Sequence, residues 1–105
     1  MALFGSELRT DILIAIGRLG NTYISELARL LDRTPTEITR AVSSLESAGI
    51  VASRRMGQTR VISLEPRYLA SDELYALLLR LSELPKYKGL WSQLRRRPRA
   101  IGKPL

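Results

Sequence analysis

One face of a predicted helix at residues 35–48 carries short hydroxyl side chains and a single long cation. Such a face suits the major groove of DNA, because short side chains let the helix backbone come close to the base edges. The cation, Arg40, can pair with guanine or with a phosphate. The alternative is an ordinary exposed helix face. The candidate DNA-binding residues on this helix are Thr36, Thr39, Arg40 and Ser43.

A second polar cluster, at residues 54–60, surrounds Gly57 in a predicted β-hairpin. Three of its seven residues are arginines, and a hairpin that follows the DNA backbone or enters the minor groove needs such cations. The alternative is a row of solvated charges on an edge strand. The candidates here are Arg54, Arg55, Gln58, Thr59 and Arg60, and three further candidates outside the hairpin are Ser25, Arg33 and Ser44.

The sequence lacks the side chains that many enzyme mechanisms use. The 105 residues include no Cys and no His, which excludes thiol nucleophiles, disulfides and imidazole acid–base catalysis. The acidic residues are scattered rather than clustered, so they do not form an expected metal site. We therefore expect a protein that is not an enzyme and that binds no metal and no cofactor.

The charge is distributed unevenly along the chain, whose formal net charge is +7. Residues 1–53 hold five arginines and six acids, a net of −1, whereas residues 54–105 hold twelve Lys or Arg and four acids, a net of +8. A basic half favours a polyanionic partner such as nucleic acid, although it can also serve solubility alone. No apolar run approaches a membrane span and no signal peptide is evident, so we expect a cytoplasmic protein without a membrane partner.

Local signals mark the ends of the elements that must position these side chains. Thr34 and Glu37 form a capping-box pattern with Pro35 at the favoured first helical position. Gly49 suits a terminating left-handed residue. With the apolar spacing, these signals predict helices at 6–19, 25–31, 35–48 and 71–84, a short strand at 22–24, and hairpin strands at 50–56 and 59–64.

Residues 24–64, ISELARLLDRTPTEITRAVSSLESAGIVASRRMGQTRVISL, resemble the winged helix-turn-helix transcriptional regulators of the ArsR/MarR-like group. The matching positions include Glu26-Leu27-Ala28, Thr34-Pro35, Thr39-Arg40 and Leu45-Glu46. The resemblance implies a mainly α fold with a small β-hairpin wing, in the order helix, helix, helix, hairpin, helix. Two departures stand out: the interhelix turn has Asp32-Arg33 where the group has Gly and an aliphatic residue, and the Cys and His of its metal-sensing branch are absent.

The resemblance also implies the domain organisation and the function. Residues 1–66 would form the DNA-binding domain and 67–84 a dimerisation helix packed on it. The composition of residues 85–105, with seven basic residues and no acid, predicts a basic, partly mobile extension. The protein would be a sequence-specific regulator of transcription that binds double-stranded DNA, a homodimeric repressor whose helix 35–48 reads the major groove and whose wing 54–60 contacts phosphate or the minor groove. The expected dimer contacts are Leu13, Ile14, Leu74, Leu77, Leu78 and Leu81.

Two other classes of function stay open at this point. A winged helix can bind protein instead of DNA, for example as the partner or antitoxin component of a two-gene system. It can also bind RNA, although aromatic side chains for stacking on bases are scarce, with one Phe, one Trp and four Tyr in the chain. The small polar helix face and the basic hairpin favour double-stranded DNA.

Overall fold

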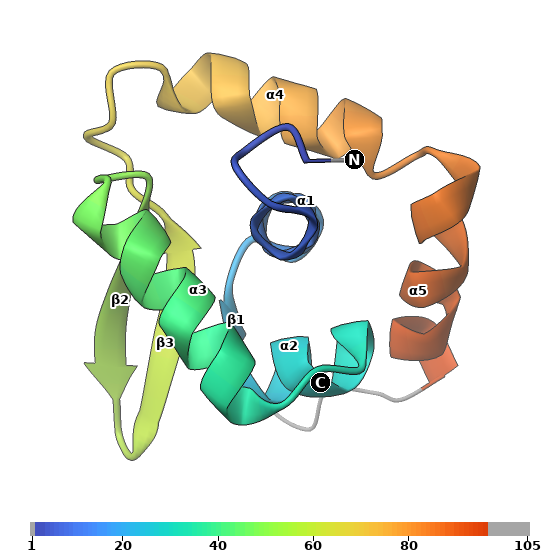
Figure 1. Ribbon diagram of the computed structural model, residues 1–105, viewed down its shortest axis with the longest axis horizontal. Helices are drawn as coiled ribbons and strands as arrows, with labels where there is room; N and C mark the ends of the chain where they lie inside the picture. The colour runs from blue at the N-terminus through green and yellow to red at the C-terminus, as the bar shows by residue number, and fades with distance from the viewer. Residues whose placement is uncertain (1, 97–105) are drawn as a thin grey trace, which may run out of the picture.

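The computed structural model describes residues 2–96, which form five helices and a three-stranded antiparallel sheet (Figure 1). This order confirms the predicted mainly α fold with a hairpin wing. The sheet has the strand order β1-β3-β2. The elements are α1 (Glu7–Leu19), β1 (Thr22–Tyr23), α2 (Ile24–Leu31), α3 (Pro35–Ser47), β2 (Val51–Met56), β3 (Thr59–Leu64), α4 (Ser71–Leu81) and α5 (Pro85–Arg96).

The predicted capping box at the start of α3 is present. The Thr34 hydroxyl accepts a hydrogen bond from the Glu37 N–H at 3.1 Å, and the Glu37 carboxylate accepts one from the Thr34 N–H at 2.9 Å. Two backbone donors that the helix leaves without partners are thereby satisfied. Before α3, Asp32 ends α2 in the left-handed conformation with φ 57° and ψ 52°, a conformation that Asp tolerates better than most residues.

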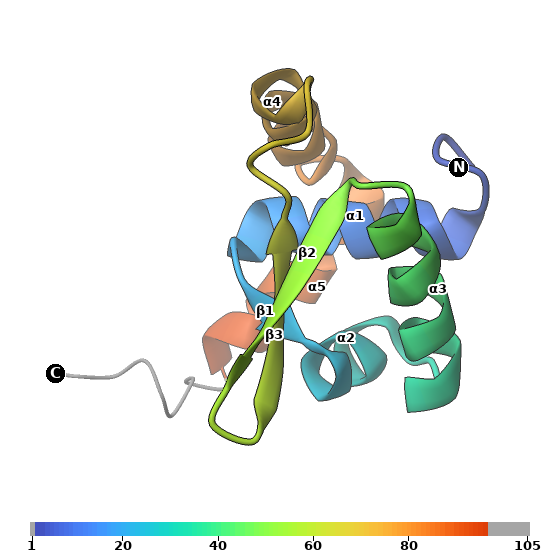
Figure 2. The ribbon, with the colours of Figure 1, turned by 90° about the vertical axis from the view of Figure 1, so that its left-hand side faces the viewer.

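The β2–β3 hairpin forms the wing. Its turn is at Gly57, which has a φ of +66° that favours glycine. Strand β1 extends the sheet by pairing with β3, with Thr22 opposite Ile62. The hairpin begins beside the C-terminal end of α3 and diverges from this helix toward its turn, which points away from α4 (Figure 2). The wing and α3 are therefore neighbouring elements of one surface.

Helix α1 lies at the centre of the molecule. Figure 1 looks along its axis and shows α2, α3, α4 and α5 around it. Residues 12–16 are all fully buried. They point in every direction around the helix axis, so α1 must be covered on all sides. The sequence led us to expect a second subunit over Leu13 and Ile14. That expectation is wrong, because both side chains are 0% exposed within a single chain.

The last helices also differ from expectation. Helix α4 ends at Leu81 rather than 84, and Ala70 is its N-cap instead of Ser71. The segment from residue 85, expected to be a basic extension, begins with the helix α5. Its Tyr87 and Trp91 belong to the same hydrophobic core as α1, and Tyr87 is hydrogen-bonded to Asp11 of that helix. Residues 97–105 of the predicted extension lie outside the described residues.

Candidate nucleic-acid interface

The polar face of α3 is exposed along its length. Thr36, Thr39, Arg40 and Ser43 are all exposed to solvent, as the helical spacing predicts. The opposite face is buried in the core, where it fixes the rotation of the helix about its axis. Its inward residues are Ile38, Val42 and Leu45, none more than 3% exposed.

The carboxyl group of Glu37 caps the start of α3 through its hydrogen bonds with Thr34. The backbone N–H of Thr34 is the main cause that lowers the pKa of Glu37 below its ordinary value, with smaller contributions from the Thr34 hydroxyl and the guanidinium of Arg33. The Arg33 side chain pairs with Glu37 at 3.4 Å. Arg33, a candidate contact from the sequence, is thus exposed and held beside the start of α3.

The strand register divides the wing candidates between the two faces of the sheet. Arg55 lies directly opposite Arg60, whereas Arg54 lies opposite Val61. Because side chains alternate along a strand, Arg55 and Arg60 share the face of Ser53 and the buried Ile62. The other face carries Arg54 and Thr59, which line a hollow of about 510 Å³. The predicted cluster is therefore two groups, with Gln58 exposed at the turn between the strands.

Arg60 differs from the other wing arginines because it is paired within the chain. One guanidinium nitrogen donates to Glu46 Oε1 at 2.7 Å, and the Arg60 Nε donates to the Ser53 hydroxyl at 3.1 Å. Ser53 in turn donates to Glu46 Oε2 at 2.6 Å. The sequence made Arg60 a candidate DNA contact of the wing. In the structure its guanidinium forms an ion pair with Glu46 of α3.

A shallow groove next to α3 brings in a cation that sequence reasoning missed. Arg9, from the first turn of α1, lines it together with Arg40 and the half-buried Ser44. No local signal pointed to Arg9, because its place beside α3 depends on how α1 packs. Ser25, the remaining candidate, is exposed near the start of α2.

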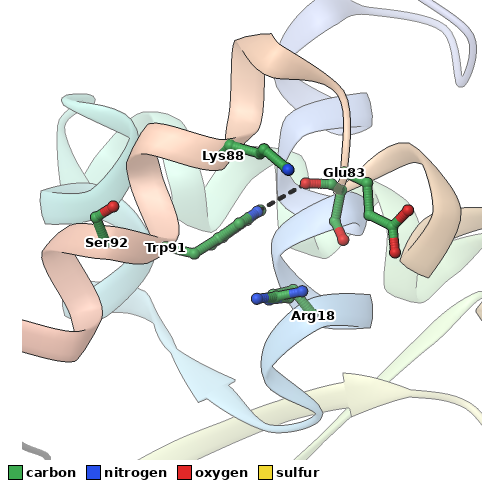
Figure 3. Close-up of a pocket in the computed structure, with 6 residues that line it drawn as sticks. Arg18, Glu83, Lys88, Trp91 and Ser92 are labelled. Atoms are coloured by element: carbon green, nitrogen blue, oxygen red, sulfur yellow. Dashed lines mark hydrogen bonds between the residues drawn. The ribbon is translucent and has the colours of Figure 1, made fainter.

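A separate polar cavity of about 430 Å³ lies between α1, α4 and α5 (Figure 3). The indole N–H of Trp91 donates to the Ser82 carbonyl at 2.8 Å, and the Arg18 guanidinium lies 5.8 Å from the centroid of the Trp91 ring. Lys88 and Glu83 complete a lining of mixed charge. These contacts hold α5 against the core, away from α3 and the wing.

Among residues 2–96, no group of three or more His, Cys, Asp or Glu side chains is placed to hold a metal ion. No helix in this part of the chain is both long and apolar enough to cross a membrane. The arrangement that remains is an exposed helix and hairpin with small polar and cationic side chains.

Comparison with known proteins places this arrangement in a family. A family model described as HVO_A0114 matches residues 6–65, which is more than half of the chain. The chain belongs to the HVO_A0114 family. The match includes α1, the helix-turn-helix formed by α2 and α3, and the wing. No curated protein matches the sequence of this HVO_A0114 member.

Solved structures of transcriptional regulators share the fold of this HVO_A0114 member. The adhesin competence repressor AdcR of Streptococcus pyogenes aligns with a TM-score of 0.61 and 13% identity over 90% of this chain and 69% of its own. A transcriptional regulator homologue of Pyrococcus horikoshii aligns at 0.59 and 20% identity, over 73% of this chain and 80% of its own.

A third solved structure contains nucleic acid. A variant of Lactococcus lactis ZitR, in complex with DNA, aligns at 0.58 and 18% identity over 84% of this chain and 61% of its own. This HVO_A0114 member therefore spans less than two thirds of that ZitR chain. The structural likenesses confirm the winged-helix fold that residues 24–64 predicted.

Proposed function

We propose that this protein is a regulator of transcription that binds double-stranded DNA in a sequence-specific manner. The observation that carries the proposal is the outward face of α3, where Thr36, Thr39, Arg40 and Ser43 are exposed directly opposite a buried apolar face. A helix that is fixed in this way presents short side chains that fit a major groove. The DNA complex of ZitR, a protein of the same fold, supports the proposal.

In this proposal each element has its own part in binding. The N-terminal half of α3 enters the major groove, where Arg40 pairs with a guanine or a phosphate. The wing contacts phosphate or the minor groove through Arg54, Arg55, Gln58 and Thr59. Ser25, exposed near the start of α2, donates to a phosphate, and Arg33, just before α3, does so by exchanging its long, exposed pairing with Glu37. None of these roles needs a metal, a cofactor or catalysis, and the protein acts in the cytoplasm.

We also propose a homodimer that represses transcription by occupying a palindromic site. Leu74 and Leu78 are buried in the core of one chain, so an interface must use the outer side of α4. Leu77, which is 43% exposed, lies on that side with the half-buried Leu81 one turn further on, and Leu84, which is 40% exposed, follows the end of the helix. Paired recognition helices would then lie about 34 Å apart, one turn of DNA.

Selection of bound duplexes from a random DNA pool tests the function. We expect an enriched palindrome whose half-sites are separated by about one helical turn. Recovery of no preferred duplex would overturn the proposal, and selection of an RNA in a parallel pool would favour an RNA-binding role instead.

Arg40→Ala then tests the reading helix on the selected site. Loss of a base contact costs about 1–3 kcal/mol of discrimination, so we expect preference to relax by roughly tenfold or more at one position of each half-site. Lys88→Ala removes a positive charge from an exposed position on α5, away from α3 and the wing, and is the matched control. Equal effects of the two variants would contradict base reading by Arg40.

A further inference from the structure

We infer that Glu46, Ser53 and Arg60 form a clamp that fixes the wing against α3, and that Arg55, rather than Arg60, is the wing cation on the α3 side that contacts a DNA phosphate. We call these three residues the helix–wing clamp. The inference rests on the proposed function, since it assigns roles within the same DNA-binding surface. It makes Arg60 a positioning residue.

The clamp joins three elements by a closed ring of hydrogen bonds. Glu46 comes from α3, Ser53 from β2 and Arg60 from β3. Each oxygen of the Glu46 carboxylate accepts one bond, from Ser53 at 2.6 Å and from Arg60 at 2.7 Å, and the Arg60 Nε closes the ring to Ser53 at 3.1 Å. Both strands of the wing are therefore attached to one side chain of the recognition helix.

The register explains why Arg60 needs this partner. Arg55 and Arg60 are directly opposite each other on neighbouring strands, and like charges in that position repel. The Glu46 carboxylate offsets this repulsion. Its side chain is 32% exposed and that of Arg60 is 36% exposed, so water screens the pair only in part and the charge-assisted bonds are strengthened.

The two arginines therefore differ in what they offer to DNA. An arginine that already pairs with a carboxylate adds little net charge to the binding surface, and it releases few counterions from DNA unless the pair breaks. Arg55 is exposed and has no ion pair with a carboxylate among the described residues. Arg55 is thus the cation on that face which is available to a phosphate.

Fixing the wing has a direct consequence for recognition. The wing and α3 must reach the DNA together, and an interface whose parts are already held at the right spacing loses less entropy when it binds. Release of the clamp should therefore reduce affinity for the selected site more than affinity for random DNA. That pattern separates positioning from phosphate contact.

The first experiment compares Arg60→Gln with Arg55→Gln on the selected duplex over a range of salt concentrations. A lost phosphate contact lowers the slope of log affinity against log salt by about one unit. We expect that change for Arg55→Gln. For Arg60→Gln we expect a nearly unchanged slope and a loss of preference for the selected duplex over a random one. A drop of about one unit for Arg60→Gln would overturn the inference.

The second experiment exchanges the charges of the clamp. We expect Arg60→Glu to weaken specific binding by roughly tenfold or more, within the range of couplings between contacting residues. The double variant Glu46→Arg, Arg60→Glu should recover much of that loss, because the attraction between helix and wing is restored. A double variant that binds no better than Arg60→Glu alone would show that position 60 faces the phosphates, and would overturn the clamp.

Thermal unfolding of the wild type, Glu46→Arg, Arg60→Glu and the double variant without DNA separates this inference from the proposed function. We expect each single reversal to lower Tm and the double exchange to recover part of the difference. If the wild-type protein prefers no duplex, the proposed function fails while the unfolding series still decides whether the clamp exists. If the wild-type protein binds a selected site and the exchange rescues neither Tm nor specificity, only the clamp is overturned.

Discussion

The Tyr87 hydroxyl donates a 2.6 Å hydrogen bond to the Asp11 carboxylate, joining α5 to α1. The Tyr87 ring is only 1% exposed, so the bond forms at the edge of the core. Lys86 adds a weaker charge contact, 3.9 Å from Asp11 and 3.1 Å from Glu7. Together these contacts make α5 a structural part of the domain.

Tyr87→Phe removes the hydroxyl and keeps the ring. Hydrogen bonds to charged groups contribute about 1.5–3 kcal/mol, so we expect the free energy of unfolding to fall by about 1–3 kcal/mol. Denaturation followed by the fluorescence of Trp91, the single Trp of the chain, measures this change. Tyr75→Phe is the control, since its side chain is 46% exposed. An equal loss for both variants would refute the role of the Asp11 bond.

The same tyrosine predicts a dependence of stability on alkaline pH. Burial, followed by the hydrogen bond and the charge of Asp11, raises the pKa of Tyr87 from 10.0 to about 12. Because the folded-state pKa lies above the unfolded value, its stabilising contribution is fully present below pH 10 and is lost as the pH rises through about 12. Unfolding midpoints measured across this window should fall more steeply for the wild type than for Tyr87→Phe. Parallel curves would argue against the raised pKa.

Gly17 marks the closest approach of α1 and α4. A Cβ added there would lie 2.7 Å from the Leu78 Cβ, and neither backbone can move freely within the packed core. We expect Gly17→Ala to lower the free energy of unfolding by about 1–3 kcal/mol through overpacking. Gly89→Ala is the matched control: no atom lies within 4 Å of its added Cβ, and Ala in an open helix position should stabilise by about 0.5–1 kcal/mol. Unfolding in urea measures both free energies of unfolding and distinguishes the expected decrease for Gly17→Ala from the expected increase for Gly89→Ala.

The proposed dimer predicts that a charge on the outer side of α4 separates the subunits. Leu77 is 43% exposed, so Leu77→Glu should leave the fold of the single chain intact while it abolishes dimerisation. Sedimentation equilibrium at micromolar concentration should show a dimer for the wild type and a monomer for the variant. Leu69→Glu, at a side chain that is 98% exposed outside α4, should stay dimeric. A monomeric wild type would disprove the dimer.

Local chemistry explains why much of the fold was predictable. The start of α3 depends on Thr34, Pro35 and Glu37, which are close together in the chain. The side chains of Thr34 and Glu37 each accept a hydrogen bond from the other's backbone N–H, and Pro35 has no N–H that needs a partner. The wing turn depends in the same way on the left-handed conformation that Gly57 allows. The exposed polar face of α3 followed from helical spacing alone, because Ile38 and Val42 determine which side turns inward.

Packing between distant segments decided what the sequence could not. Leu13 and Ile14 make the first helix apolar on more than one face, which indicated a second surface that covers it. Sequence spacing does not say whether that surface belongs to the same chain. The surface belongs to the same chain: α4 packs closely on α1 at Gly17, and Tyr87 and Trp91 of α5 join the same core. The composition of that segment had instead suggested a basic extension.

The sequence by itself determined the secondary structure up to the wing, the winged-helix order and the candidate residues of α3, because hydrophobic periodicity and caps act over a few neighbouring residues. Only the tertiary structure decided which candidates share a surface. It paired Arg60 with Glu46, fourteen residues away, and brought Arg9 and Arg40 into the lining of one groove. The physical reason is that charge compensation and exposure depend on distance in space, which the order of residues along the chain does not specify.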